Sequence, residues 1–295
     1  MNSYLLSLLL GIIEGLTEFL PVSSTAHLRI SEALLGIDLS SGYWKMYTIV
    51  IQLGAILCLP IYFWPRIRKF FATFPRGEGG DRNAATHPLT LTFIAFVVTA
   101  IPAWLLTKLI GKHLENLFIM AWALIAGGIA MWLIDTLFSS SSSEVSEFRR
   151  VRTERMEQMT LPQAVWIGAC QILSAVFPGT SRSMSTISAG QLARMSRPAA
   201  LEFSFFLSMP TMAAATLYDL FRTLHPKSGA PNPIGAFGID AHGWALLAIG
   251  FTVSFFVAWG VVAWFMRWVR QRGFVLFAIY RILLGAGVLL WVAHR

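Results

Sequence analysis

The chain has 295 residues, of which 56% are hydrophobic and only 13% are charged. One soluble core cannot hide this much apolar surface, so the composition excludes a soluble globular protein and predicts an integral membrane protein. The net charge of +8 does not indicate a nucleic-acid partner, because Lys and Arg stand mostly in short loops. The two cysteines, Cys58 and Cys170, lie in apolar runs, which indicates neither a disulfide nor a zinc site.

The first predicted element, residues 3–36, is a membrane segment that is broken in the middle. Two short apolar pieces meet at Pro21, within the string EGLTEFLPVSSTAH. Polar groups at membrane depth are tolerated only where they pack in protein or line a wet cavity, so we interpret the segment as a re-entrant helix hairpin. It resembles a cleavable signal peptide only weakly, because no positive residues precede the apolar run, and we expect it in the mature protein.

Ionisable side chains on this hairpin are the first functional candidates. Glu14 and Glu18 are four residues apart and share one face of a helix, where a divalent cation or a proton fits between them. The alternative is that one glutamate pairs with a buried basic group. Ser24 and His27 also share a face if the second helix begins near Ser23, whose hydroxyl can cap it. Because carboxylates facing lipid are too costly, we interpret these side chains as part of a functional cavity.

Six apolar blocks are long enough to cross a bilayer as helices, at residues 44–64, 89–111, 115–138, 198–221, 243–266 and 274–293. A polar, charged linker, 139–160, separates the third block from the second half of the chain, and we expect residues 139–158 to form an exposed helix or loop. A second broken segment, residues 161–195, follows the linker. The predicted fold class is therefore an all-α polytopic membrane protein with six transmembrane helices and two re-entrant hairpins.

The second hairpin breaks at Pro178-Gly179, within the string FPGTSRSMSTIS. Free N–H groups at a helix start, hydroxyl donors and the guanidinium fork of an arginine are the chemistry that binds phosphate. The alternative explanation is that small hydroxyl residues pack helices together. We predict phosphate-binding residues from both breaks: Ser23, Thr25, Gly179, Thr180, Ser181, Arg182, Ser183 and Thr186.

An internal repeat relates the two halves of the chain. At a constant offset of 157 residues, Gly11 falls on Gly168, Glu14 on Gln171, Pro21 on Pro178, Ser24 on Ser181 and Gly128 on Gly285. This predicts a single membrane domain of two repeats, about 1–138 and about 161–295. Each half holds one hairpin and three spans, an odd number of crossings, so the second copy is inverted and the two hairpin tips converge near the midplane. The acidic first tip would then face Ser181 and Arg182 of the second.

Basic residues set the predicted orientation. If 65–88, 139–160 and 267–273 are the cytoplasmic loops, they hold 12 Lys or Arg, against 6 in the outside loops and span ends. The positive-inside rule then places both termini outside. We expect the first hairpin to open outward and the second inward.

At these residues the chain resembles the undecaprenyl-diphosphate phosphatase family of bacterial membrane proteins, also called the bacitracin-resistance family. EGLTEFLPVSSTAH looks like the first family motif and FPGTSRSMSTIS like the second, and VIQLG (50–54) and EFSF (202–205) are similar to further family strings. The resemblance implies an inner-membrane enzyme that removes the terminal phosphate of the C55 isoprenyl diphosphate, which recycles the carrier lipid for peptidoglycan synthesis. It also implies Mg²⁺ or Ca²⁺ as cofactor and a site made of Glu14, Glu18, Ser24, His27 and Arg182. The family's diphosphate arises in the outer leaflet, so the resemblance, together with the outward-opening first hairpin, implies an active site open to the periplasmic or extracellular side.

The sequence leaves two choices of mechanism open. Ser24 attacks the terminal phosphorus or positions a water that does, and either His27 or a glutamate serves as the base. A rival function is a transporter or flippase of lipid phosphates or anions, because inverted repeats with broken helices are typical of secondary transporters. A purely structural scaffold explains neither broken hairpin. The predicted partners are the isoprenyl diphosphate and membrane lipids, without nucleic acid, and a homodimer is one arrangement that the sequence allows.

Overall fold

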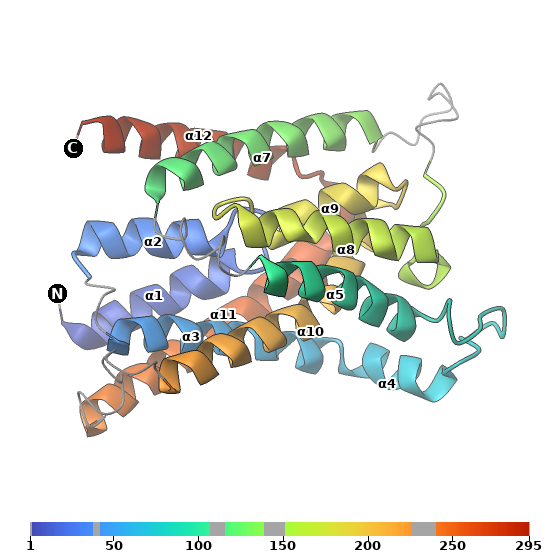
Figure 1. Cartoon of the computed structure of the whole chain (residues 1–295), viewed down its shortest axis with the longest axis horizontal. Helices are drawn as coiled ribbons and strands as arrows, with labels where there is room; N and C mark the ends of the chain where they lie inside the picture. Colours follow the sequence, from blue (N-terminus) through green and yellow to red (C-terminus); the bar gives the residue numbers. More distant parts are fainter. Residues whose placement is uncertain (1, 38–41, 107–115, 139–150, 226–239, 295) are drawn as a thin grey trace.

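The computed structural model describes residues 2–37, 42–106, 116–138, 151–225 and 240–294 (Figure 1). Over these residues the chain is helical, with one isolated β-bridge between Thr153 and Met195. The helices are α1 (Ser3–Thr17), α2 (Ser24–Leu35), α3 (Gly42–Tyr62), α4 (Trp64–Thr73), α5 (Pro88–Leu105), α7 (Leu117–Phe138), α8 (Leu161–Val176), α9 (Arg182–Leu192), α10 (Arg197–Leu224), α11 (Ala241–Gln271) and α12 (Val275–Ala293), with a 3-10 turn at Met156–Gln158.

Six of these helices, α3, α5, α7, α10, α11 and α12, are long and apolar enough to cross a membrane, which confirms the six predicted spans. Large apolar side chains cover their outer faces, among them Phe93, Trp104 and Leu283, each more than 60% exposed. Exposed apolar surface on this scale is unfavourable in water but is satisfied by lipid. The protein is therefore a multi-pass membrane protein.

One helix, α4, occupies part of a segment that was expected to be a loop, 65–88. Its charged residues, Arg66, Arg68 and Lys69, lower the local hydropathy below that of a span, but Phe70 on its other face is only 1% exposed. Pro65 at its first turn starts the helix. The pattern is that of an amphipathic helix at a membrane end, which a search for long apolar runs does not detect.

The two broken segments form helix pairs, α1 with α2 and α8 with α9. Each first helix packs closely against a span of the other half, α1 along α11 and α8 along α5. Glycine permits both contacts, because a Cβ on Gly11 would lie 2.8 Å from the Gly250 carbonyl oxygen and one on Gly168 would lie 2.5 Å from the Ala95 carbonyl oxygen. The matching of the two contacts is compatible with the re-entrant hairpins and the inverted repeat.

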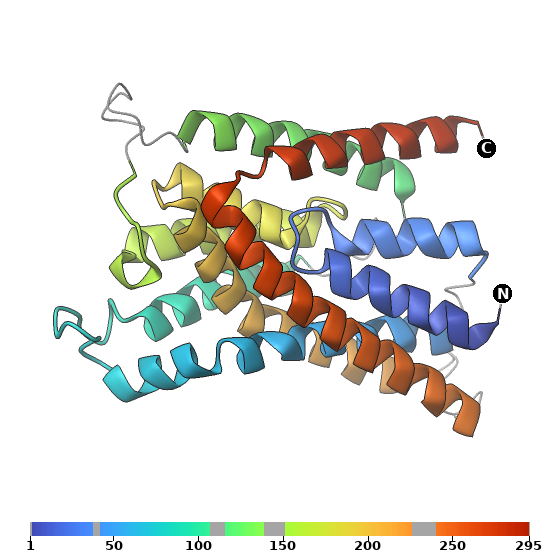
Figure 2. The same cartoon turned by 180° about the vertical axis from the view of Figure 1, so that it is seen from behind.

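The two ends of the bundle carry different segments (Figures 1 and 2). α1 begins and α12 ends at one end, whereas α4, the residues before α8 and the turn between α11 and α12 lie at the other. The helix breaks lie between these ends. The described parts of the three segments expected on the cytoplasmic side are therefore on one side of the protein.

Residues 139–158 were expected to be exposed, but part of the described linker is buried. Met156 and Met159 are each 1% exposed and belong to the main apolar core. Backbone bonds from Arg152 and Thr153 to the Arg194 carbonyl hold the segment in place. Residues 139–150 of the predicted linker lie outside the described residues.

A buried aspartate connects four helices behind the hairpins. Asp135 of α7 is 0% exposed and accepts hydrogen bonds from Gln191 of α9 at 2.8 Å and Arg197 of α10 at 2.7 Å. The backbone N–H of Phe274, which precedes α12, donates to the same carboxylate at 2.8 Å. Because each oxygen is satisfied, this charge is stable in the apolar interior and fixes α9 against its neighbours.

Candidate active site

Both helix breaks end in a serine that caps the following helix. Ser23 caps α2 and Ser181 caps α9, with backbone φ values of 73° and 70°, and each hydroxyl accepts the backbone N–H three residues on. This confirms the predicted cap at Ser23. A non-glycine residue in such a sparsely populated conformation costs roughly 1–3 kcal/mol, so the surrounding contacts must hold both breaks in shape.

The caps make Ser24 and Arg182 the first residues of their helices. The two caps are 158 residues apart, whereas the sequence repeat has an offset of 157. One residue is therefore gained within the second break, and by position in the helix Ser24 matches Arg182 rather than Ser181. The two halves thus present different chemistry at the same structural place.

Glu18 joins the two breaks. Its Oε2 accepts a hydrogen bond of 2.6 Å from the Ser24 hydroxyl, and its Oε1 pairs with Nη2 of Arg182 at 3.3 Å. Arg182 also donates to the Ser204 carbonyl at 3.4 Å and lies over the ring of Phe19. The Glu18 side chain is 3% exposed and that of Arg182 is 13% exposed. One buried carboxylate therefore contacts both the candidate nucleophile and the candidate phosphate-binding group.

A cavity of about 560 Å³ opens beside these side chains. Its polar part is lined by Glu18, Ser23, Ser24, Thr25, Gln171, Gly179, Ser181 and Arg182. The walls from α5 and α10 are mostly apolar, with Phe96, Ala100, Ala103, Trp104, Met212, Ala214 and Ala215, and their polar members are Thr99, Thr211, Tyr218 and Asp219. A polar end that continues into an apolar trough between two spans suits a ligand with a charged head and an apolar tail.

Three of the predicted phosphate-binding residues do not line this cavity. The Ser183 hydroxyl donates to a carbonyl of the first break at 3.2 Å, and the Thr186 hydroxyl shares a hydrogen bond of 2.6 Å with that of Ser204. Thr180 accepts a hydrogen bond from Arg281 through its backbone carbonyl. These groups hold α9 and its tip in place, which corresponds to the packing alternative for this hydroxyl cluster.

His27 is engaged away from the candidate nucleophile. Its Nδ1 lies 2.7 Å from the Ser23 carbonyl and therefore carries a proton, while Nε2 lies 2.6 Å from the Tyr280 hydroxyl, with the two rings stacked. Within the described residues no hydrogen bond joins His27 to Ser24, and His27 does not line the cavity. The group in contact with the Ser24 hydroxyl is Glu18, which favours a glutamate as the base.

Glu14 lies one helical turn before Glu18 and is 1% exposed. Neither of its carboxylate oxygens has a hydrogen-bond partner among the described residues. A buried carboxylate without a partner is costly, so these oxygens fit a cation or a proton. Mg²⁺ and Ca²⁺ bind carboxylate oxygens and accept water or phosphate oxygens as further ligands. No group of three or more His, Cys, Asp or Glu suited to a metal occurs in the described part, so the two glutamates would be the protein's share of the ligands.

Two neighbours of the breaks, Tyr280 and Arg281 of α12, were not predicted from the sequence. Tyr280 holds His27, and Arg281 is fully buried between both breaks. The available signal was a lone arginine within an apolar span, 274–293, since such charges are costly and have a role by default. The two shorter family strings do reach the site, because Gln52 lines the cavity and the Ser204 carbonyl holds Arg182.

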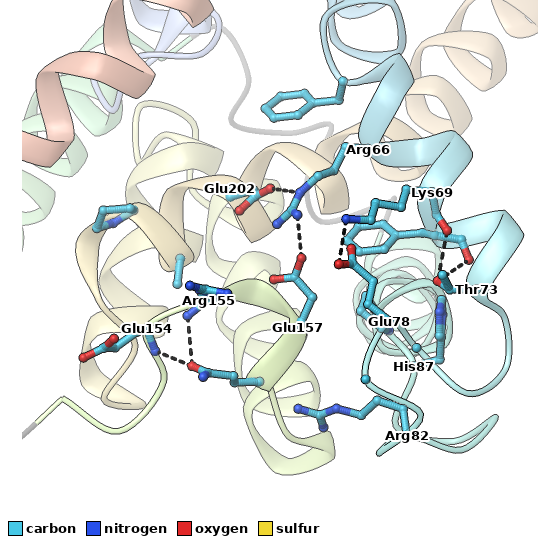
Figure 3. Close-up of a pocket in the computed structure, with 18 of the residues that line it drawn as sticks. Arg66, Lys69, Thr73, Glu78, Arg82, His87, Glu154, Arg155, Glu157 and Glu202 are labelled. Atoms are coloured by element: carbon cyan, nitrogen blue, oxygen red, sulfur yellow. Dashed lines mark hydrogen bonds and ion pairs between the residues drawn. The ribbon is translucent and has the colours of Figure 1, made fainter.

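A second cavity, of about 1020 Å³, lies at the end of the bundle that carries α4. Figure 3 shows Arg66 between Glu157 and Glu202, with N–O distances of 2.6 and 2.7 Å, and Lys69 beside Glu78 at 2.6 Å. Burial lowers the pKa of Arg66, but Glu202 and Glu157 outweigh burial and leave that pKa above its ordinary value. Because these charges neutralise one another and no predicted site residue lines this cavity, the candidate active site is the cavity at the breaks.

Comparison with known proteins gives consistent results over the whole chain. The family described as "Bacitracin resistance protein BacA" matches residues 7–287. A protein named undecaprenyl-diphosphatase from Koribacter versatilis is 64% identical over 295 residues, the full length of both chains. A protein of the same name from Novosphingobium aromaticivorans is 39% identical over the full length of both chains. Another, from Caldanaerobacter subterraneus, is 38% identical over 97% of this chain and 95% of its own.

Proposed function

The chain belongs to the family of the bacitracin resistance protein BacA, and from this premise we propose that it acts as its curated relatives are named, as an undecaprenyl-diphosphatase. It is a membrane hydrolase that converts undecaprenyl diphosphate and water to undecaprenyl phosphate and inorganic phosphate, and so recycles a carrier lipid of cell-wall synthesis. The observation that supports the residue roles is the Glu18 carboxylate, which contacts Ser24 at 2.6 Å and Arg182 at 3.3 Å in one cavity.

Arg182 and the starts of α2 and α9 bind the diphosphate in this proposal. The guanidinium fork matches two phosphate oxygens, and the free N–H groups of a helix start favour an anion. In the described structure Glu18 and the Ser204 carbonyl accept hydrogen bonds from two of the five N–H groups of Arg182, so further donors remain for phosphate oxygens. The isoprenyl chain then occupies the apolar walls formed by α5 and α10.

Glu18 is the proposed base. As the Ser24 oxygen bonds to the terminal phosphorus, its proton passes to Oε2 of Glu18, the bridging P–O bond breaks, and undecaprenyl phosphate leaves. Water then hydrolyses the phosphoserine and releases inorganic phosphate. If Ser24 instead positions a water, the same carboxylate accepts the proton of that water.

Glu14 and Glu18 are the proposed holders of a divalent cation, Mg²⁺ or Ca²⁺. Such a cation, when bound, would offset negative charge on the phosphate groups. Glu14 contributes two buried oxygens with no partner among the described residues. It therefore stabilises a positive charge one helical turn behind the base.

Phosphate release by purified protein in detergent tests the function, because transport is impossible there. Wild-type protein is expected to release inorganic phosphate from undecaprenyl diphosphate, and Ser24→Ala to lower the rate by a factor on the order of 10³ or more, as for other nucleophiles. Ser208→Ala is the matched control, since this serine is buried on α10 and outside the cavity.

Absence of phosphate release from folded wild-type protein would contradict the hydrolase and favour the transporter. Mass spectrometry of quenched reactions separates the two routes, because a phosphoserine at Ser24 is expected only if this side chain is the nucleophile. Undiminished release by Ser24→Ala would remove both roles of the serine.

We further propose that the enzyme lies in the bacterial inner membrane with the cavity open to the periplasmic or extracellular side. Trp104, Tyr218 and Asp219 line the cavity near the C-terminal ends of α5 and α10. These helix ends are directed toward the end of the bundle where α1 begins and α12 ends (Figure 1). The excess of basic residues in the loops at the α4 end supports a cytoplasmic location for that end.

Cysteine labelling in intact cells tests this orientation. In a variant with Cys58→Ala and Cys170→Ala, a membrane-impermeant thiol reagent is expected to label His225→Cys, at the end of α10. The same reagent should leave Ala84→Cys unlabelled until the cells are opened, because this exposed residue precedes α5 at the α4 end. The reverse pattern would place the cavity on the cytoplasmic side.

A further inference from the structure

Arg281 is a buried charge in the middle of α12. Its side chain is 0% exposed, and its guanidinium donates only to backbone carbonyls in the described structure. Nη1 donates to Pro21 at 3.1 Å, and Nη2 donates to Thr180 at 2.9 Å, Gly179 at 3.1 Å and Ala123 of α7 at 3.2 Å. No ion pair with a carboxylate of the described residues accompanies these bonds.

Three of these four carbonyls belong to the helix breaks. Pro21 stands two residues before the cap of α2, and Thr180 directly precedes the cap of α9. A broken helix leaves carbonyls without intrahelical donors, and in a membrane water does not replace those donors. Arg281 therefore supplies the missing donors of both breaks with a single planar group.

The bond from Arg281 to the Thr180 carbonyl also orients the next backbone N–H of the second break. In a trans peptide the carbonyl and the following N–H are directed to opposite sides. Because the Thr180 carbonyl is bonded to Arg281, the N–H of Ser181 is turned away from Arg281. Ser181 lines the cavity, and its N–H has no acceptor among the described hydrogen bonds. The tip thus keeps a backbone donor free beside Arg182.

We propose that Arg281 is a positioning residue for the reaction, in that it fixes the two breaks relative to each other. Arg281 binds the first break at Pro21 and the second break at Gly179 and Thr180. The ion pair between Glu18 and Arg182 connects the same two breaks from the side of the cavity. Arg281 itself does not line the cavity and so does not touch the substrate. This inference rests on the proposed hydrolase function, but it concerns a residue outside that site.

Gly127 of α7 provides the space that the guanidinium occupies. A Cβ at this position would lie 2.5 Å from Nη2 of Arg281 and 2.7 Å from Cε of Met184. Gly127→Ala therefore displaces the guanidinium without removing its charge. It offers a second, independent disturbance of the same contact.

The kinetic test compares Arg281→Gln, Arg281→Lys and Gly127→Ala with wild type in detergent. Misplacement of reacting groups by about 1 Å costs on the order of 100-fold in rate, so Arg281→Gln is expected to lower kcat by about this factor. KM should change far less, because Arg182 and the apolar walls remain. Arg281→Lys should recover part of kcat, since it keeps the charge but lacks the fork. Gly127→Ala should lower kcat in the same direction.

Arg66→Gln is the matched control. It also removes a partly buried guanidinium with two partners, but at the opposite cavity, so it is expected to lower the melting temperature and leave kcat nearly unchanged. A folded Arg281→Gln variant with the kcat of wild type would overturn the proposal. If Arg281→Gln does not fold, a wild-type kcat in Gly127→Ala would overturn the proposal instead.

A distance measurement keeps the inference separate from the hydrolase function. Spin labels on Leu34→Cys in α2 and Leu192→Cys in α9, both exposed positions, report how the second helices of the two hairpins are placed. In the background without Cys58 and Cys170, Arg281→Gln or Gly127→Ala should broaden or shift the label distance, whereas Arg66→Gln should not. Unchanged label distances in Arg281→Gln and Gly127→Ala would overturn the positioning role. Absence of phosphate release from wild-type protein would instead contradict the proposed hydrolase function, so the two failures can be told apart.

Discussion

Glu18→Gln is expected to lower phosphate release by a factor on the order of 10³–10⁴, the upper range for loss of a positioned base. An amide cannot take the proton of Ser24. Its single oxygen can accept from only one of the two donors that Glu18 binds, the Ser24 hydroxyl at 2.6 Å or Arg182 at 3.3 Å. The measurement is kcat in detergent, with the melting temperature as a check of folding. A folded variant with wild-type kcat would remove Glu18 as the base.

Glu32→Gln is the matched control for this variant. Glu32 is likewise a buried carboxylate of the first hairpin, 1% exposed and 3.1 Å from Arg29, but it does not line the cavity. Its replacement is expected to leave kcat close to that of wild type.

Glu14→Gln separates the cation from the base, because it should raise the concentration of Mg²⁺ or Ca²⁺ needed for half activity and allow recovery at saturating metal. An unchanged metal requirement in both Glu14→Gln and Glu18→Gln would exclude the proposed cation site.

Arg182→Ala is expected to lower kcat/KM by a factor on the order of 10³–10⁵, the range found when an arginine stabilises a transferring phosphoryl group. Arg182→Lys keeps the charge but loses the planar fork, so its loss should be smaller yet still severe. Both variants should also weaken inhibition by inorganic pyrophosphate, which reports binding of the diphosphate group independently of the lipid.

Arg270→Ala is the control for the arginine series, because this exposed arginine lines the far cavity. It should keep both the rate and the pyrophosphate inhibition of wild type. Wild-type kcat/KM in Arg182→Lys would contradict the fork, and unchanged pyrophosphate inhibition in Arg182→Ala would contradict the role of Arg182 in binding.

Much of the site could be predicted from two strings because helix breaks have local causes. Pro21 and Pro178-Gly179 interrupt apolar segments, and Ser23 is a typical cap, so the positions of the breaks were readable without the fold. The structure brings Glu18, Ser24 and Arg182 of these strings together in one cavity. Family resemblance added the reaction, which no spacing of residues indicates.

The remaining details depended on neighbours that are distant in the sequence. The spacing of Ser24 and His27 correctly indicates one helix, but it does not show that Tyr280, 253 residues away, binds the imidazole. The hydroxyls near Arg182 are equally suited to phosphate and to packing. Only the fold shows that the Ser183 hydroxyl contacts the first break and that the Thr186 hydroxyl contacts Ser204 of α10.

The sequence by itself determined the six spans, the two breaks and the residue types at the breaks, because hydropathy over about 20 residues and helix capping act within a single segment. The tertiary structure decided which polar groups share the cavity, which carboxylate contacts Ser24, and that Arg281 joins both breaks. These choices follow from a physical constraint that acts between segments: in a membrane each buried polar group must find its partner within the protein, and here the partners come from the other half of the chain.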